Sequence, residues 1–198
     1  MSEPYAEVIE GETLIRKAPG TRHEIICYRL HSILHSSVAN IASTRLLGPR
    51  AQINVSLRTS LCPDLALVTT ASGKLWLAAE IVSPDDHKAD TVIKKQIYED
   101  LKLSRLWMID PRYDNVEVYH GTQYGLMLKE ILAGREILTE KLLPEFQVTI
   151  SELFETSQAW HSATQLIGRR WRRRNDSWRN TYHAYPVLRI AYCVLRRL

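Results

Sequence analysis

Apolar side chains recur with a helical period near the start of the chain. Five of them lie on one helical face: Ile25, Ile26, Leu30, Ile33 and Leu34. This spacing is typical of an amphipathic α-helix. We predict the helix over residues 21–39, with Thr21 as its N-cap and Glu24 completing a capping box. A strand is predicted before it, over residues 12–16.

Short apolar runs bounded by turn residues follow this helix. They predict strands over residues 51–57, 65–68, 75–82, 106–109 and 116–119. Residues 126–131 and 136–141 are expected to extend the sheet as a hairpin around Gly134.

Two further helices are predicted among the strands. Residues 89–102 have a helical pattern whose apolar face comprises Val92, Ile93, Ile97 and Leu101. Ser151 is expected to cap a short helix that ends at Phe154. Helices that alternate with strands are typical of a sheet with helices packed against it. The predicted fold class is therefore α/β, a mixed β-sheet flanked by helices.

Positive charge is concentrated at one end of the chain. The formal net charge is +4, but residues 169–198 contain nine arginines and a single acidic residue, Asp176. This segment therefore carries +8, which leaves −4 for residues 1–168. The length and the hydrophobic content of 45% suit one sizeable core. We predict one domain over residues 1–168 and a basic C-terminal extension over residues 169–198.

Three interpretations of this extension remain open. It could be a nucleic-acid-binding arm in which aromatic residues stack on bases, with Trp171, Trp178, Tyr182 and Tyr185 available for this. Residues 187–195 are apolar with arginines beside them, so the segment could instead lie on an anionic membrane surface. It could also be an addition that takes no part in the function of the core.

The cysteines and the N-terminus predict a cytoplasmic protein. Cys27, Cys62 and Cys193 are odd in number and show no metal-ligand spacing, which suits a reducing compartment. The first residues are rich in glutamate and lack the basic and apolar regions of a signal peptide. No run approaches the roughly 20 apolar residues that span a bilayer.

Two carboxylates mark a candidate metal site. Asp64 precedes one predicted strand, and Glu80 lies near the end of the next. If these strands are neighbours, both side chains project from the same end of the sheet. Carboxylate oxygens, completed by a backbone carbonyl and waters, suit Mg²⁺ or Mn²⁺ better than zinc.

Glu80 is the more informative of the two residues. It interrupts an apolar run, residues 75–82, where a buried carboxylate is costly unless it is paired or bound to a metal. Phosphodiester hydrolysis would explain such a site. A bound metal neutralises charge on the phosphoryl oxygens and lowers the pKa of a water, and a lysine can position that water.

Several short motifs occur in an order that resembles a known family. They are Pro63-Asp64, Glu80-Ile-Val-Ser83-Pro84, Asp90 with Lys94 and Tyr98 at four-residue steps, and Leu106-Trp-Met-Ile-Asp110-Pro111. The ends of the same pattern are Glu7-Val-Ile-Glu-Gly11-Glu12 with His23, and Leu143-Pro144-Glu145-Phe146 with Ser151-Glu-Leu-Phe154. From about Tyr5 to Phe154, the chain resembles the Uma-type restriction endonuclease family of the PD-(D/E)XK nuclease superfamily.

The resemblance implies a restriction-endonuclease-like α/β core, a nucleic-acid substrate, and Asp64 and Glu80 as ligands of Mg²⁺ or Mn²⁺. The parent motif has its lysine two residues after the glutamate, where this chain has Val82. Lys94 matches the family's helix and is the candidate for the displaced catalytic lysine. Lys95 is the alternative, because sequence alone does not determine the helix phase.

Three further residues are candidates for supporting roles. Glu7 could add a third carboxylate, and His23 could face the substrate. Tyr98 follows Lys94 by one turn, where it could support the lysine or simply pack. Asp110, which precedes Pro111, is expected to form a turn.

The combined interpretation is a metal-dependent endonuclease that hydrolyses phosphodiester bonds, with DNA as the expected substrate. A homodimer is expected because cutting both strands of a duplex needs two sites. The main alternative is a non-catalytic module that keeps the fold and binds nucleic acid or a protein. The acidic core favours this alternative, because phosphate binding relies on basic surfaces. A hydrolase of another phosphoester is a third possibility.

Overall fold

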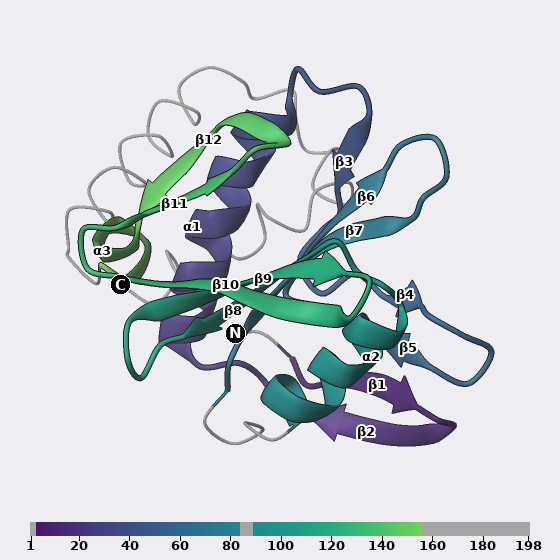
Figure 1. Ribbon diagram of the computed structural model, residues 1–198. Coiled ribbons are helices and arrows are strands. Elements are labelled where there is room, and N and C mark those ends of the chain that lie inside the picture. Colours follow the sequence, from purple (N-terminus) through teal and green to yellow (C-terminus); the bar gives the residue numbers. More distant parts are fainter. Residues whose placement is uncertain (1–2, 84–88, 156–198) are drawn as a thin grey trace, which may run out of the picture. The chain divides into compact units, whose positions relative to one another are not determined.

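The computed structural model describes residues 3–83 and 89–155, without the side chains of residues 89 and 90. Six strands form its main sheet, in the order β10-β9-β8-β7-β6-β3. Their bounds are β3 Thr44–Leu46, β6 Leu65–Thr69, β7 Leu75–Ile81, β8 Arg105–Asp110, β9 Asn115–Thr122 and β10 Gly125–Ala133. β7 and β8 run parallel, and the other neighbours are antiparallel. The predicted mixed sheet flanked by helices is confirmed (Figure 1).

Two smaller sheets accompany the main one. The first has the order β2-β1-β5-β4, and the second pairs β11 with β12. Their bounds are β1 Tyr5–Ile9, β2 Glu12–Arg16, β4 Ile53–Asn54, β5 Ser60–Leu61, β11 Ile137–Glu140 and β12 Leu143–Thr149. β1 and β2 form an antiparallel hairpin in which Tyr5 lies opposite Arg16. Both residues line the same pocket.

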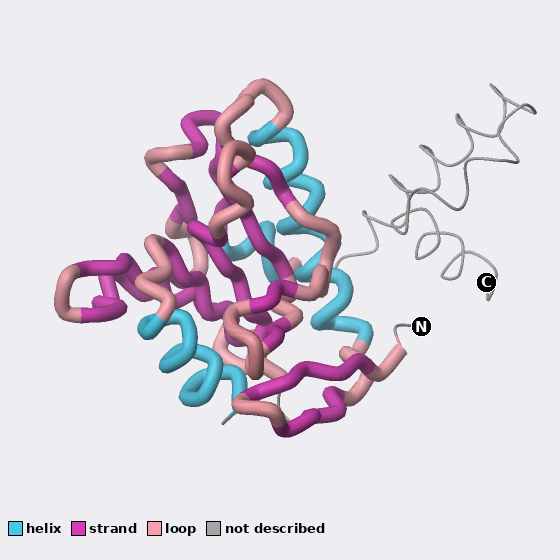
Figure 2. The backbone as a smooth tube through the Cα atoms, turned by 90° about the vertical axis from the view of Figure 1, so that its right-hand side faces the viewer, coloured by secondary structure: helices cyan, strands magenta, loops and turns pink. Residues whose placement is uncertain are grey.

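The helices cover opposite faces of the main sheet, as Figures 1 and 2 show. On β8, Trp107 and Ile109 pack in one core cluster with Leu30 of α1 (Thr21–Val38), β12 and α3 (Ile150–Phe154). The intervening Leu106 and Met108 pack in a second cluster with Tyr98 of α2 (Lys95–Asp100). This alternation follows from the two-residue repeat of a β-strand. It explains why the central strands are apolar on both faces.

The second predicted helix has a different phase from the one expected. Its first part, Ala89–Lys94, is a π-helix (η1), and α2 continues it over Lys95–Asp100. Val92 and Ile93, predicted on the packing face, are exposed, and Lys94 and Tyr98 are buried instead. The wider π-helical turn breaks the 3.6-residue repeat on which the prediction depended.

Other local predictions also need correction. The cap of α1 is Gly20 rather than Thr21, and α3 is capped by Thr149 and Glu152, not by Ser151. Of the strand predicted over residues 51–57, only Ile53–Asn54 (β4) is a strand. The hairpin around Gly134 does not form, because β10 pairs with β9 and β11 pairs with β12. β1, β3 and β12 were not predicted at all.

No helix in the described part of the chain is both long enough and apolar enough to cross a bilayer. The predicted boundary at residue 168 and the basic extension after it lie outside the described residues. The domain division therefore stays a prediction.

Candidate active site

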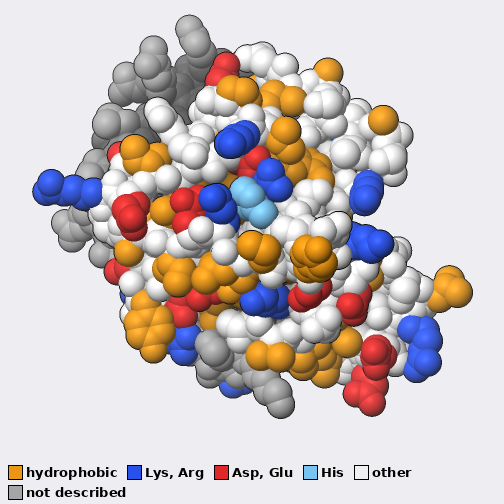
Figure 3. All heavy atoms as spheres, viewed as in Figure 1, with side chains coloured by type: hydrophobic (Ala, Val, Ile, Leu, Met, Phe, Trp, Pro, Cys, Tyr) orange, Lys and Arg blue, Asp and Glu red, His pale blue; other side chains and the backbone are white. Residues whose placement is uncertain are grey.

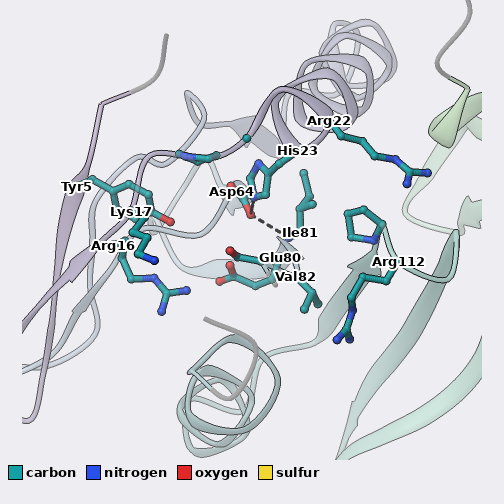
Figure 4. Close-up of a pocket in the computed structure, with 14 residues that line it drawn as sticks. Tyr5, Arg16, Lys17, Arg22, His23, Asp64, Glu80, Ile81, Val82 and Arg112 are labelled. Atoms are coloured by element: carbon teal, nitrogen blue, oxygen red, sulfur yellow. Dashed lines mark hydrogen bonds and ion pairs between the residues drawn. The ribbon is translucent and has the colours of Figure 1, made fainter. Parts of the chain in front are cut away.

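A pocket of about 290 Å³ opens between the β1–β2 hairpin, the start of α1, the end of β7 and the β8–β9 turn. Asp64 and Glu80 line it together with His23 (Figure 4). The positively charged residues around them are Arg16, Lys17, Arg22 and Arg112. On the face drawn in Figure 3, positive and negative side chains are interspersed. The pocket thus combines two carboxylates with cations contributed by separate elements.

Asp64 and Glu80 come from neighbouring antiparallel strands. Leu65 pairs with Ala79, so the residues that flank this pair meet at the same end of the sheet. The backbone N–H of Ile81 donates a hydrogen bond of 2.9 Å to Asp64 Oδ2. The expected meeting of the two carboxylates is confirmed. Both are almost fully buried, at 3% and 1% exposure.

Lys94 lies between two carboxylates. Its Nζ is 3.0 Å from Glu80 Oε2 and 2.9 Å from Glu7 Oε1. The backbone N–H of Cys62 donates a further hydrogen bond of 2.8 Å to Glu7 Oε1. A buried ammonium is costly unless it is paired, and here two carboxylates offset the desolvation. Arg16 lies on the other side of Glu7, with Nε 3.5 Å from Oε2.

Tyr98 holds the other oxygen of Glu80. Its hydroxyl donates a hydrogen bond of 2.5 Å to Glu80 Oε1. Burial, followed by the charge of Glu80, raises the pKa of Tyr98 well above its ordinary value. The phenol therefore stays a donor at any physiological pH. Lys95, the alternative lysine, lies elsewhere, with Nζ 4.0 Å from the ring centre of Tyr119.

Asp64 has its own set of partners. His23 Nε2 is 3.2 Å from Asp64 Oδ2. Arg50 reaches Asp64 Oδ1 at 3.3 Å and Glu24 Oε1 at 2.7 Å. Burial alone would raise the pKa of Asp64, but the charge of His23 and its hydrogen bond lower it overall. The reciprocal effect of Asp64 raises the pKa of His23 despite burial, which opposes it.

Three of the candidate residues, Asp64, Glu80 and His23, line the pocket. Lys94 and Tyr98 contact Glu80, and Glu7 contacts Lys94, so the structure brings all six together and leaves out only the alternative Lys95. Asp110 forms the expected turn, accepting a hydrogen bond of 2.9 Å from the backbone N–H of Arg112. Sequence reasoning missed Tyr5, Arg16 and Arg50. The only hint was the placement of Tyr5 beside the glutamate-rich N-terminal motif.

The donor chemistry of the pocket fits a hard cation with few protein ligands. Asp64 and Glu80 supply carboxylate oxygens, and Asp64 Oδ1, which accepts one hydrogen bond from Arg50, keeps a lone pair for a metal. Within residues 3–83 and 89–155, no three or more His, Cys, Asp or Glu side chains are grouped to hold a metal. Mg²⁺ commonly keeps several waters and takes only one or two carboxylates from the protein.

Comparisons with known proteins agree with this architecture. Residues 2–151 match the Uma2 family model, described as "Putative restriction endonuclease". Among solved structures, the chain is similar to "a putative nuclease belonging to DUF820" from Anabaena variabilis. The two are 21% identical, with a TM-score of 0.64, and the match covers 77% of this chain and 91% of the other. No curated protein matches. The likeness confirms the predicted nuclease-type α/β fold.

Proposed function

This chain belongs to the Uma2 family, and on that premise we propose that it is an endonuclease that hydrolyses phosphodiester bonds in DNA with Mg²⁺ or Mn²⁺. The observation that carries the proposal is the contact between Lys94 and Glu80, 3.0 Å apart. The family match supports a nuclease, and the metal, the substrate and the residue roles belong to the proposal.

Asp64 and Glu80 would hold the cation. When bound, it would neutralise charge on the phosphate and lower the pKa of an attacking water. His23 and Arg50 orient Asp64, and Tyr98 orients Glu80, through the contacts described above. Hydrogen-bond partners of a metal-binding side chain fix the direction in which its lone pairs point.

Lys94 takes the role of the lysine that the parent motif places on the strand. Its ammonium has three donors, and two are directed to Glu7 and Glu80. A charge fixed in this way can stabilise the negative charge that develops on the phosphate, without reorganising during the reaction. Glu7 acts as the second anchor of the lysine rather than as a third metal ligand.

The test is cleavage of supercoiled plasmid and single-stranded DNA in Mg²⁺, Mn²⁺ or EDTA. Glu80→Gln and Lys94→Met should abolish metal-dependent cleavage. The matched control, Lys95→Met, should leave it unchanged, because Lys95 packs on Tyr119 outside the pocket. Cleavage that survives Glu80→Gln, or continues in EDTA, would refute the proposed mechanism.

A non-catalytic module that binds nucleic acid is the second candidate. The formal charge of −4 over residues 1–168, and the mixed charges in Figure 3, favour it over a nuclease with a strongly basic cleft. It predicts DNA binding that EDTA does not alter and no cleavage under any metal. The same purified protein and substrates distinguish the two candidates.

Two properties accompany the proposal. We expect a homodimer, because two active sites are needed to cut both strands, and light scattering of the purified protein tests this. We expect the protein in the cytoplasm. Cys27 and Cys62 are free and buried, which suits a reducing compartment, and fractionation of the host cells tests the location.

A further inference from the structure

The side chain of Tyr5 lies across the pocket from the main sheet. Tyr5 is the first residue of β1, in the hairpin that carries Glu7 and Arg16. Figure 4 shows its hydroxyl directed toward Asp64 and Glu80, and Tyr5 lines the pocket with both. The hairpin therefore supplies a donor group on the side of the pocket opposite the carboxylate-bearing strands.

The hydroxyl of Tyr5 makes no hydrogen bond with any residue that the structure describes, although it is partly buried. Buried or half-buried tyrosine hydroxyls usually have a partner, because losing water without replacement is unfavourable. The other tyrosine of the site, Tyr98, does have one in Glu80. A ligand that enters the pocket would give Tyr5 the partner that it lacks.

The charges around Tyr5 determine what kind of partner it can take. Burial raises the pKa of Tyr5 above its ordinary value, and Asp64 raises it further. The phenol consequently keeps its proton and can donate a hydrogen bond but cannot act as a base. The matching ligand atom is an acceptor, and an anionic oxygen forms the stronger hydrogen bond.

We infer that the Tyr5 hydroxyl donates a hydrogen bond to a non-bridging oxygen of the phosphodiester that is to be cleaved. The inference rests on the proposed nuclease function and assigns a substrate-binding residue outside the Asp64, Glu80 and Lys94 set. Tyr5 approaches from the hairpin side, whereas Asp64 directly precedes β6 and Glu80 lies in β7. A phosphate in the pocket would be held between them.

The first measurement is single-turnover cleavage of DNA by wild type, Tyr5→Phe and Tyr124→Phe. Tyr124 is the matched control, because it is 85% exposed and lies in the turn between β9 and β10. Loss of one hydrogen bond to a charged oxygen should slow Tyr5→Phe by roughly 10- to 100-fold. Tyr124→Phe should match wild type, and the thermal midpoints should agree within error.

A second measurement tests the contact itself. DNA in which sulfur replaces one non-bridging oxygen, in either configuration, accepts a hydrogen bond more weakly at that atom. In Mn²⁺, which tolerates sulfur better than Mg²⁺ does, wild type should lose rate with one configuration. Tyr5→Phe should lose much less with the same substrate, because its hydrogen bond is already absent. A merely structural role for Tyr5 would not produce this coupling.

The outcomes distinguish a failure of the proposed function from a failure of the role of Tyr5. If wild type does not cleave DNA, the proposed function fails and the role of Tyr5 fails with it. If wild type cleaves and Tyr5→Phe cleaves equally fast, only the role of Tyr5 is overturned. The same conclusion follows if the sulfur effect is identical in wild type and Tyr5→Phe for both configurations.

Discussion

Lys94 Nζ lies 3.0 Å from Glu80 Oε2 although the two residues belong to different elements, the end of η1 and the strand β7. The position two residues after Glu80 is Val82, which packs in the core beneath α2. In the proposed mechanism the catalytic lysine therefore comes from η1 rather than from the strand, where the apolar Val82 takes its place. Both stability and the proposed activity would then depend on Lys94.

Replacing Lys94 with Met should destabilise the metal-free protein. The substitution keeps the apolar length but leaves the buried carboxylates of Glu7 and Glu80 without the ammonium between them. Removing one partner of a buried ion pair costs about 3–5 kcal/mol, which urea unfolding can measure. Adding Glu7→Gln should restore part of the loss, because one of the two buried carboxylates that faced the ammonium then carries no charge.

Lys95→Met is the control for this experiment. Its free energy of unfolding should fall by at most about 1 kcal/mol, because Lys95 makes a cation–π contact with Tyr119 rather than a buried ion pair. Equal stability of the two lysine variants would show that Lys94 is not held as the structure indicates.

Tyr98→Phe should weaken metal binding while leaving the pocket intact. The hydroxyl fixes Glu80 Oε1, and losing such an outer partner of a metal ligand costs about 10- to 100-fold in affinity. Calorimetric titration with Mn²⁺ measures the change. Stability should also fall, by about 1.5–3 kcal/mol for a hydrogen bond to a charged group.

Tyr119→Phe provides a matched comparison. Tyr119 donates an equally short hydrogen bond, 2.5 Å, to Glu117 on the same strand, away from the pocket. It should lose stability but keep its Mn²⁺ affinity. If both variants bind Mn²⁺ like wild type, Glu80 is not a ligand that Tyr98 orients.

The sequence predicted the carboxylates better than the lysine, for a physical reason. A strand repeats every two residues, so Asp64 and Glu80 at the ends of adjacent runs had to meet once the strands paired. The apolar context of Glu80 showed that it needed a cation. Both inferences used only local pattern.

The helix phase and the loop contacts could not be predicted from the local sequence pattern. The π-helical turn over Ala89–Lys94 rotates Lys94 inward and Val92 outward, against the ordinary helical pattern. Arg50 lies in a loop with a positive φ of 56°, and its contact with Asp64 depends on tertiary structure. For Tyr5 the sequence offered only its place beside the glutamate-rich N-terminal motif, because its proposed role depends on where the hairpin packs.

The His23–Asp64 pair should stabilise the metal-free protein within a limited pH window. Asp64 has a lowered pKa in the folded state, so its contribution is present above about pH 3.9, the unfolded value, and is lost as the pH falls through the folded pKa. His23 has a raised pKa, so its contribution is full below about pH 6.5 and is lost as the pH rises through the folded pKa.

The measurement is the difference in unfolding free energy between wild type and His23→Gln, in EDTA, from pH 3 to pH 9. It should be largest between about pH 4 and pH 6.5 and smaller on both sides. Glutamine can keep a hydrogen bond to Asp64 but carries no charge. A difference that does not vary with pH would show that the pair is not ionic.

Arg29→Met should destabilise the fold without affecting the site. The guanidinium of Arg29, from α1, donates hydrogen bonds to the carbonyl oxygens of Leu153 and Glu155, each 2.8 Å long, and to that of Glu152. These carbonyls lie at the end of α3, where a helix leaves its last carbonyls without partners. Losing charged hydrogen bonds to one buried and two part-buried carbonyls should cost about 3 kcal/mol.

Mn²⁺ affinity at 20 °C should stay unchanged in Arg29→Met, because Arg29 contacts α3 and does not line the pocket. Urea unfolding and calorimetric titration on the same preparation test both halves of the prediction. A loss of affinity equal to that of Tyr98→Phe would mean that the metal site depends on global stability. The orienting roles assigned to Tyr98 and His23 would then need another explanation.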